Sequence, residues 1–401
     1  MSSEFGKILR VSVFGQSHGP AIGIVMQNVP AGEVIDEAEL LAFMGRRKAK
    51  GVLSTLRHED DIPLFLSGMI HWQTCGSPLC AILENKDAQS KDYEALKEVP
   101  RPSHADYVAY KKWGKHTDMR GGGHFSGRLT APLCIGGGVA KQILARRGVF
   151  VGAHLASVAG IEDEPFGLYP TQELFSEVAQ KHFPTIDDAS GERMQHAIKE
   201  AAADKDSVGG VIECAAIGMP AGLGAPMFEG IENKLAAAIF GIPAVKGIEF
   251  GSGFESARQR GSGHNDPIIL DEQKNITMEK NDAGGINGGI TNGMPIRFNV
   301  AFKPTPSINK PQKSVHLASL EETELVIHGR HDPCIAHRAV PVVEAVAALV
   351  LLDVILEHNH GHQRNKKQNR RGRRKALSSL HRAHAPVRAS CRVQATELSP
   401  A

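Results

Sequence analysis

A histidine among small residues lies near the start of the chain, in the run Gly15-Gln16-Ser17-His18-Gly19. Alternating apolar residues on both sides of this run predict two strands joined by a turn. A histidine in a turn is accessible and titrates near neutral pH, as a general acid requires. A histidine that only faces water produces the same pattern, so the motif alone leaves both readings open.

A second polar group extends from Arg101 to Arg128 and contains Ser103, His104 and Asp106, followed by Arg120-Gly121-Gly122-Gly123-His124-Phe125-Ser126-Gly127-Arg128. Consecutive glycines let backbone N–H groups approach an anion, and a helix starting near Thr130 would point its positive end toward it. Arg120 and Arg128 add donors suited to phosphate or carboxylate. The glycines could also form only a turn.

A third group lies near the C-terminus, in His328-Gly329-Arg330-His331-Asp332-Pro333-Cys334 and the following Arg338. Asp332 could act as a base or could be ion-paired with its arginine neighbours. Upstream, Lys303-Pro304-Thr305-Pro306-Ser307 has the composition of a loop that binds an anionic group. The three groups contain many arginines and histidines, few nucleophiles and no metal-ligand spacing, which favours a substrate with several negative charges.

Composition divides the 401 residues into two parts. Hydrophobic residues make up 41% and charged residues 22%, as in a soluble globular protein. Residues 358–401 contain 11 of the 46 Lys and Arg residues and one acid, Glu397, so residues 1–357 carry 35 basic and 43 acidic residues. We therefore expect one folded body, 1–357, and a basic, disordered tail, 358–401.

The cysteines and the apolar runs indicate where the protein is located and whether it contacts a membrane. The six cysteines show no CxxC pair, which is typical of reduced thiols in a cytoplasmic protein. Lys7 and Arg10 interrupt any signal-peptide core. The apolar run Val340–Leu356 contains Glu344 and Asp353 and is shorter than a membrane span, so we expect a buried helix and no membrane contact.

Strand and helix patterns are interleaved without a regular βαβ rhythm. Alternation predicts strands within 7–28, 62–70 and 209–216, and helical spacing predicts helices at 37–47, 130–147 and 193–205. No GxGxxG follows the first strand. The pattern predicts a single large α+β domain and not a doubly wound dinucleotide fold.

In this order, the motifs resemble the signature regions of chorismate synthases over about residues 5–357. The matching segments are 14–19, 85–93, 101–107, 120–128, 284–293, 303–307 and 330–341. The resemblance implies a β-α-β sandwich, a homotetramer, and a trans-1,4-elimination of phosphate from 5-enolpyruvylshikimate 3-phosphate that requires reduced FMN. It also implies roles for single residues: His18 protonates the departing phosphate, His104 acts near the reduced flavin, and Asp332, assisted by Ser17, helps the flavin take the C6 proton.

The resemblance further implies ligands for the cofactor and the substrate. Arg47, Arg128 and Arg338 would hold the substrate's carboxylates and phosphate. FMN contacts would fall on His124, Phe125, Ser126, Ala244, Gly288, Lys303, Pro304, Thr305, Pro306, Ser307 and Arg330.

Several residues depart from the family pattern. Gln16 stands where the family has Glu, and His124 and Phe125 replace Arg and a small residue. A basic residue expected after Arg47 aligns near Leu53, which weakens an NADPH site, and no intrinsic flavin reductase activity is expected. These departures keep a second reading open, an FMN-binding protein of the same fold with altered substrate or impaired activity. The tail matches nothing in the family, and a reading-frame shift, an inert extension or a nucleic-acid-binding arm would each explain it.

Overall fold

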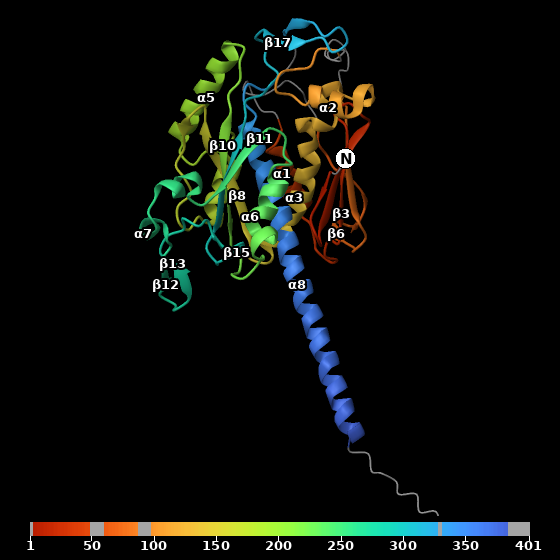
Figure 1. Ribbon diagram of the computed structural model, residues 1–401, viewed down its shortest axis with the longest axis vertical. Helices are drawn as coiled ribbons and strands as arrows, with labels where there is room; N and C mark the ends of the chain where they lie inside the picture. The colour runs from red at the N-terminus through yellow and green to blue at the C-terminus, as the bar shows by residue number, and fades with distance from the viewer. Residues whose placement is uncertain (1–2, 49–59, 87–97, 328–330, 384–401) are drawn as a thin grey trace, which may run out of the picture. The chain divides into compact units, whose positions relative to one another are not determined.

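Buried helices between two five-stranded sheets form the body of the protein (Figure 1). The structure is a computed structural model that describes residues 3–48, 60–86, 98–327 and 331–383. Residues 1–356 form one compact unit, and residues 357–401 form a second. The expectation of an α+β sandwich is confirmed for the body.

Both sheets are antiparallel, and the alternating burial typical of strands is clearest in one strand of the second sheet. In β16, every second residue from Ile296 to Phe302 is buried. The first sheet has the order β1 (Glu4–Phe5), β2 (Arg10–Gly15), β3 (Ala21–Gln27), β7 (Leu79–Glu84) and β4 (Leu64–Ser67). The second has the order β11 (Val245–Phe250), β16 (Ile296–Phe302), β10 (Gly210–Ile217), β8 (Phe150–Val158) and β9 (Ile161–Glu162).

The helix α3 (Thr130–Ala145) fills the space between the sheets because three glycines allow a close approach. A methyl group on Gly137 would lie 2.2 Å from Cβ of Ala345 in α8 (Ala336–Ala383). One on Gly136 would meet Ile24 of β3, and one on Gly138 would meet Leu40 of α1 (Glu37–Gly45). Helix α6 (Ile231–Ile239) packs on β11, while α4 (Gln172–Gln180) and α5 (Asp188–Ala203) pack on β8.

Two acids in the apolar part of α8 are paired inside the body. Glu344 accepts from Arg46 at 2.6 and 2.9 Å and from Lys141. Asp353 accepts from the backbone N–H groups of residues 7, 8 and 9 at 2.7–2.8 Å. By length and composition Ala336–Gly361 could cross a membrane, but 89% of its apolar window is buried in the protein. The prediction of a buried helix is confirmed.

Short elements border the functional region and the far end of the body. They are α2 (Asp106–Trp113), the 3-10 helices η4 (Gly114–His116), η5 (Arg120–Phe125), η6 (Gly127–Leu129), η7 (Met227–Glu229) and η8 (Gly253–Arg258), α7 (Gly261–His264), and the strand pairs β5 (Met69–Ile70) with β6 (Gln73–Thr74), β12 (Ile268–Leu270) with β13 (Ile276–Met278), β14 (Ile286–Asn287) with β15 (Ile290–Thr291), and β17 (Gln312–Val315) with β18 (Glu322–Leu325).

The helix α8 continues further than the sequence predicted. Disorder was expected from residue 358, whereas α8 is helical to Ala383. The tail contains Lys, Arg, Gln and Ala, which favour helix, and it extends an existing helix, so the cost of a new helical nucleus does not arise. Residues 384–401 lie outside the described residues.

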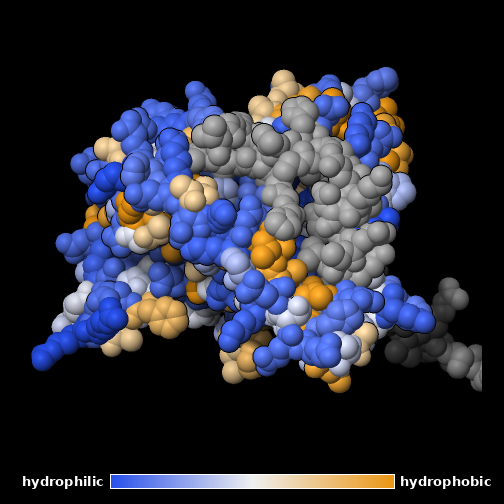
Figure 2. Space-filling view, turned by 90° about the horizontal axis from the view of Figure 1, so that it is seen from above, coloured by the Kyte–Doolittle hydropathy of each residue, from blue (hydrophilic) through white to orange (hydrophobic). Residues whose placement is uncertain are grey.

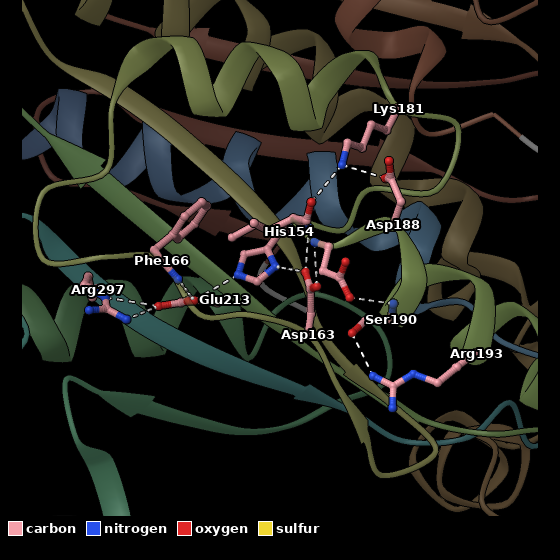
Figure 3. A network of polar contacts seen from close by, with 11 residues as sticks. His154, Asp163, Phe166, Lys181, Asp188, Ser190, Arg193, Glu213 and Arg297 are labelled. Atoms are coloured by element: carbon pink, nitrogen blue, oxygen red, sulfur yellow. Dashed lines mark hydrogen bonds and ion pairs between the residues drawn. The ribbon is translucent and has the colours of Figure 1, made fainter.

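A buried histidine joins three strands of the second sheet to the covering loop (Figure 3). His154 of β8 is fully buried, and its two ring nitrogens lie 2.9 Å from Asp163 and 2.9 Å from Glu213 of β10. Glu213 also accepts from Arg297 of β16 at 2.5 Å. Burial opposes the charged imidazolium, but the hydrogen bonds to the two carboxylates outweigh it and raise the pKa of His154.

We expect His154→Ala to lower the free energy of unfolding by about 3 kcal/mol near pH 6, because it leaves the buried Asp163 without its cation and Glu213 with Arg297 alone. A raised folded-state pKa gives stability that is present below the ordinary histidine pKa of 6.5 and is lost as pH rises through the folded value. Urea unfolding of both proteins should therefore show a smaller difference at pH 9 than at pH 6. An equal difference at both pH values would contradict a charged His154.

Candidate functional site

The turn that carries Ser17 and His18 packs against the triple-glycine run. Gly121, Gly122 and Gly123 have φ of 59°, 86° and 55°, a region that favours glycine. A methyl group on Gly121 would lie 2.1 Å from the His18 ring, and one on Gly122 would lie 3.5 Å from the His104 ring. The backbone of Ser17 donates to the Gly123 carbonyl at 3.0 Å. Sequence segments about 100 residues apart thus bring both predicted catalytic histidines to one loop.

His104 is held by a buried ion pair at the start of α2. Its Nδ1 lies 2.6 Å from Asp106 Oδ1, and Arg101 donates to the two Asp106 oxygens at 2.7 and 2.8 Å. Burial would raise the pKa of Asp106, but hydrogen bonds from Arg101 and His104 and their charges hold it well below its usual range. Nδ1 of His104 also lies 3.0 Å from Nη2 of Arg101, but the shorter contact with the Asp106 carboxylate, which only accepts, favours a proton on Nδ1 and leaves the other nitrogen on the Gly122 side.

Two of the predicted substrate arginines share one buried acid. Arg47 donates to Asp61 at 2.5 Å, and Arg128 donates to the other oxygen of the same carboxylate. All three side chains are buried. Burial alone would raise the pKa of Asp61, but the charges of Arg47 and Arg128 lower it. Asp61 therefore stays ionised and holds two guanidinium groups together that would otherwise repel each other.

The third predicted arginine connects Asp332 to this cluster. Arg338 donates to Asp332 at 2.6 Å and to the backbone carbonyl of Arg47 at 3.1 Å. His331, which directly precedes Asp332, is half-buried. Burial and the charges of Arg101 and His104 lower the pKa of His331. Contacts thus extend without a break from Asp332 through Arg338 and Arg47 to Asp61 and Arg128.

Part of the predicted FMN set lies beside His104. Lys303 donates to the carbonyl of Ser103, and its backbone donates to the Ala244 carbonyl at 3.0 Å. Ser307 lies 3.4 Å from Arg101. Burial and the nearby Lys246 lower the pKa of Lys303. Among the described residues, Oγ1 of Thr305 is buried without a hydrogen-bond partner. Two neighbouring ammonium groups and an unsatisfied hydroxyl suit a phosphate group, so these residues fit the flavin that the sequence implies.

The three predicted flavin contacts after the glycines also serve the fold. His124 bonds the Gly15 carbonyl at 2.7 Å and the Ser3 hydroxyl at 2.6 Å. The Phe125 ring packs 6.0 Å from Trp113, and the Ser126 hydroxyl accepts from the backbone of Arg128. Both nitrogens of His124 are thus engaged, and the residue that replaces the usual arginine fixes the turn before His18.

One predicted residue, Gly288, is not brought to this group. Gly288 lies in the turn between β14 and β15, before β16 begins, whereas Lys303 follows its other end. The seven residues of β16, at about 3.3 Å each, span roughly 20 Å. Figure 1 shows β15 at the opposite end of the body from α2 and β17. Arg330, like Leu53, lies outside the described residues; Pro304 and Pro306 lie in the loop after β16.

Four residues that lie in the site have no role predicted from the sequence: Asp61, Asn85, Asp106 and Lys246. Asp106 and Asn85 lie inside matched motifs, so their motifs were the available signal. Asp61 and Lys246 have no such motif, and only the folded chain shows their partners. No group of three His, Cys, Asp or Glu side chains in the described part of the chain could hold a metal ion.

Figure 2 views the end of the body that bears α2 and β17, where hydrophilic and hydrophobic residues are interspersed among the coloured atoms. An α+β sandwich with arginines, histidines and paired carboxylates gathered at one end has the composition of an enzyme active site suited to an anionic ligand.

Comparison with known proteins identifies the family. Residues 9–356 match the family model described as chorismate synthase. The chain is 44% identical over 367 residues to the chorismate synthase of Lancefieldella parvula, covering 88% of this chain and 96% of that one. It is also 44% identical over 352 residues to that of Pyrococcus abyssi, covering 88% and 97%. A crystal structure of a chorismate synthase superposes with a TM-score of 0.68 at 26% identity, covering 88% and 93%. The chain belongs to the chorismate synthase family.

Proposed function

We propose that this protein eliminates phosphate from 5-enolpyruvylshikimate 3-phosphate to give chorismate, the last common step of aromatic amino acid biosynthesis, with reduced FMN. It would be a carbon–oxygen lyase acting on phosphates. The observation that carries the proposal is the junction of His18 and His104 on one glycine loop, next to the buried arginines. The substrate has two carboxylates and a phosphate, which match this charge.

The residues divide the work by their surroundings. Arg47, Arg128 and Arg338 bind the anionic groups of the substrate, and Asp61 keeps the first two in place. His18, held against Gly121, gives a proton to the departing phosphate. Asp332, paired with Arg338 and assisted by Ser17, would help a bound flavin take the proton that leaves C6. Arginines that neutralise the phosphate make it a better leaving group.

The flavin would be held near His104. Lys303, Thr305 and Ser307 offer donors for its phosphate, Ala244 and Pro304 to Pro306 offer backbone contacts, and Lys246 adds a second cation. Reduced FMN would supply electron density to the ring while the phosphate leaves, with no net oxidation. His104, oriented by Asp106, would exchange protons with a reduced flavin held beside it. No intrinsic flavin reductase activity is expected, so reduced flavin would come from another source.

Anaerobic titration tests the cofactor and the substrate together. The protein should bind reduced FMN, and adding 5-enolpyruvylshikimate 3-phosphate should change the flavin spectrum while chorismate accumulates. FMN binding with no response to the phosphorylated substrate would instead favour the alternative, a flavoprotein of this fold with altered substrate or impaired activity.

A homotetramer in the cytoplasm is the proposed assembly. The hairpin β12–β13 exposes Ile268, Leu270 and Ile276, and a two-stranded hairpin is marginal in water unless something covers it. Gly288 lies too far from Lys303 to share one flavin in one chain, which supports a contribution from a neighbouring copy. Sedimentation at micromolar concentration should give four copies; a monomer that turns over substrate would contradict this assembly. We propose no membrane or nucleic-acid partner.

A further inference from the structure

Asn85 connects the turn that carries His18 to the buried arginine cluster. It follows β7 directly, and its Nδ2 donates to the carbonyls of Gln16 at 3.0 Å and Gly19 at 2.8 Å. Its Oδ1 accepts from Nε of Arg128 at 3.2 Å, and its backbone N–H donates to Pro20 at 3.1 Å. One side chain thus contacts both ends of the turn and an anion-binding residue.

The turn needs such a support because it lies between two strands. The pairing of β2 with β3 ends at the pair formed by Gly15 and Ile22, and the turn connects these two residues. Within the turn, Gly19 donates to the Gln16 carbonyl at 3.0 Å. The Asn85 amide adds two donors to the carbonyls that flank Ser17 and His18. Asparagine suits the place because its side chain both donates and accepts, whereas aspartate would face the two carbonyls with acceptors only.

We propose that Asn85 is a positioning residue that fixes His18 relative to Arg128. Arg128 shares Asp61 with Arg47, so Asn85 ties the proton donor to the same unit that holds the substrate's anionic groups. The inference rests on the proposed function, in which His18 gives its proton to the departing phosphate. A displacement of about 1 Å in such an arrangement can reduce the rate about 100-fold.

The kinetic test compares Asn85→Ala with Asn28→Ala. Asn28 is the control, since its amide also donates to a backbone carbonyl, that of Ile8 at 2.8 Å, in a turn that contains none of the proposed site residues. Because Asn28 has a φ of 63°, its replacement by alanine also strains that turn, so the control accounts for a local loss of stability away from His18. We expect Asn85→Ala to lower kcat by about 10- to 100-fold with a smaller change in KM, and Asn28→Ala to keep kcat. In a His18→Ala background, Asn85→Ala should have little further effect, because Asn85 acts through His18.

A readout independent of turnover completes the test. Hydrogen exchange of the peptide spanning residues 15–20 should be faster in Asn85→Ala than in the unsubstituted protein and unchanged in Asn28→Ala, with Asn85→Asp behaving like Asn85→Ala. Unchanged exchange, an unchanged kcat, or full additivity with His18→Ala would overturn the role of Asn85. An unsubstituted protein that binds FMN but makes no chorismate would instead overturn the proposed function.

Discussion

We expect His18→Ala to lower kcat for chorismate formation by about 10²- to 10⁴-fold, the usual contribution of a positioned general acid. The ring packs against Gly121, and its neighbour Ser17 is bonded to Gly123, so the histidine has a fixed place beside the arginines. The leaving phosphate then departs without a proton. Steady-state rates with saturating reduced FMN measure the effect.

A surface histidine provides the control for this substitution. His196 lies on α5 with its ring exposed, 3.6 Å from Glu200. His196→Ala should keep the full rate, and both variants should bind reduced FMN as the unsubstituted protein does. A His18→Ala protein that keeps more than a tenth of the original kcat would show that His18 is not the general acid.

We expect Asp106→Ala to lower the free energy of unfolding by about 3–5 kcal/mol, because it leaves the guanidinium of Arg101 buried without its carboxylate partner. Both side chains are buried, and the pair is joined by two hydrogen bonds. The same change also releases Nδ1 of His104, so turnover should fall as well. Urea unfolding at neutral pH measures the stability change.

The pH dependence of this loss has a definite sign. A folded-state pKa held below the ordinary value of 3.8 means that Asp106 stabilises the protein above that pH and loses its contribution as pH falls through the folded value. The difference between Asp106→Ala and the unsubstituted protein should therefore shrink below pH 4. Asp188→Ala is the control: that side chain is 82% exposed and pairs with Lys181, so it should cost less than about 1 kcal/mol. A similar loss in both variants would contradict a buried Asp106 pair.

The sequence predicted the chemistry of the site better than its contacts. Histidine and arginine types in Gly-rich turns indicated an anionic substrate, and the alternation of β2 and β3 predicted the turn of His18. The sequence could not show that Gly121 and Gly122 would lie between His18 and His104, because that contact depends on packing of segments about 100 residues apart.

Residues whose role comes from their partners were also beyond the sequence. Asp61 is one of several acids in its segment, and only folding places it between Arg47 and Arg128. His124 was expected to contact the flavin because of its position in a motif. Its ring nitrogens also bond the carbonyl of Gly15 and the hydroxyl of Ser3, which the sequence could not show. The high density of positive charge after residue 357 favoured disorder, whereas the same Lys and Arg residues also favour helix, and α8 extends to Ala383.

Anaerobic incubation with dithionite-reduced FMN and 5-enolpyruvylshikimate 3-phosphate tests the proposed elimination most directly, with chorismate absorbance and free phosphate followed together. We predict that chorismate and phosphate are released catalytically in equal amounts, and that the release stops when reduced FMN is omitted. Phosphate released without chorismate, or no product from a protein with bound reduced FMN, would contradict it.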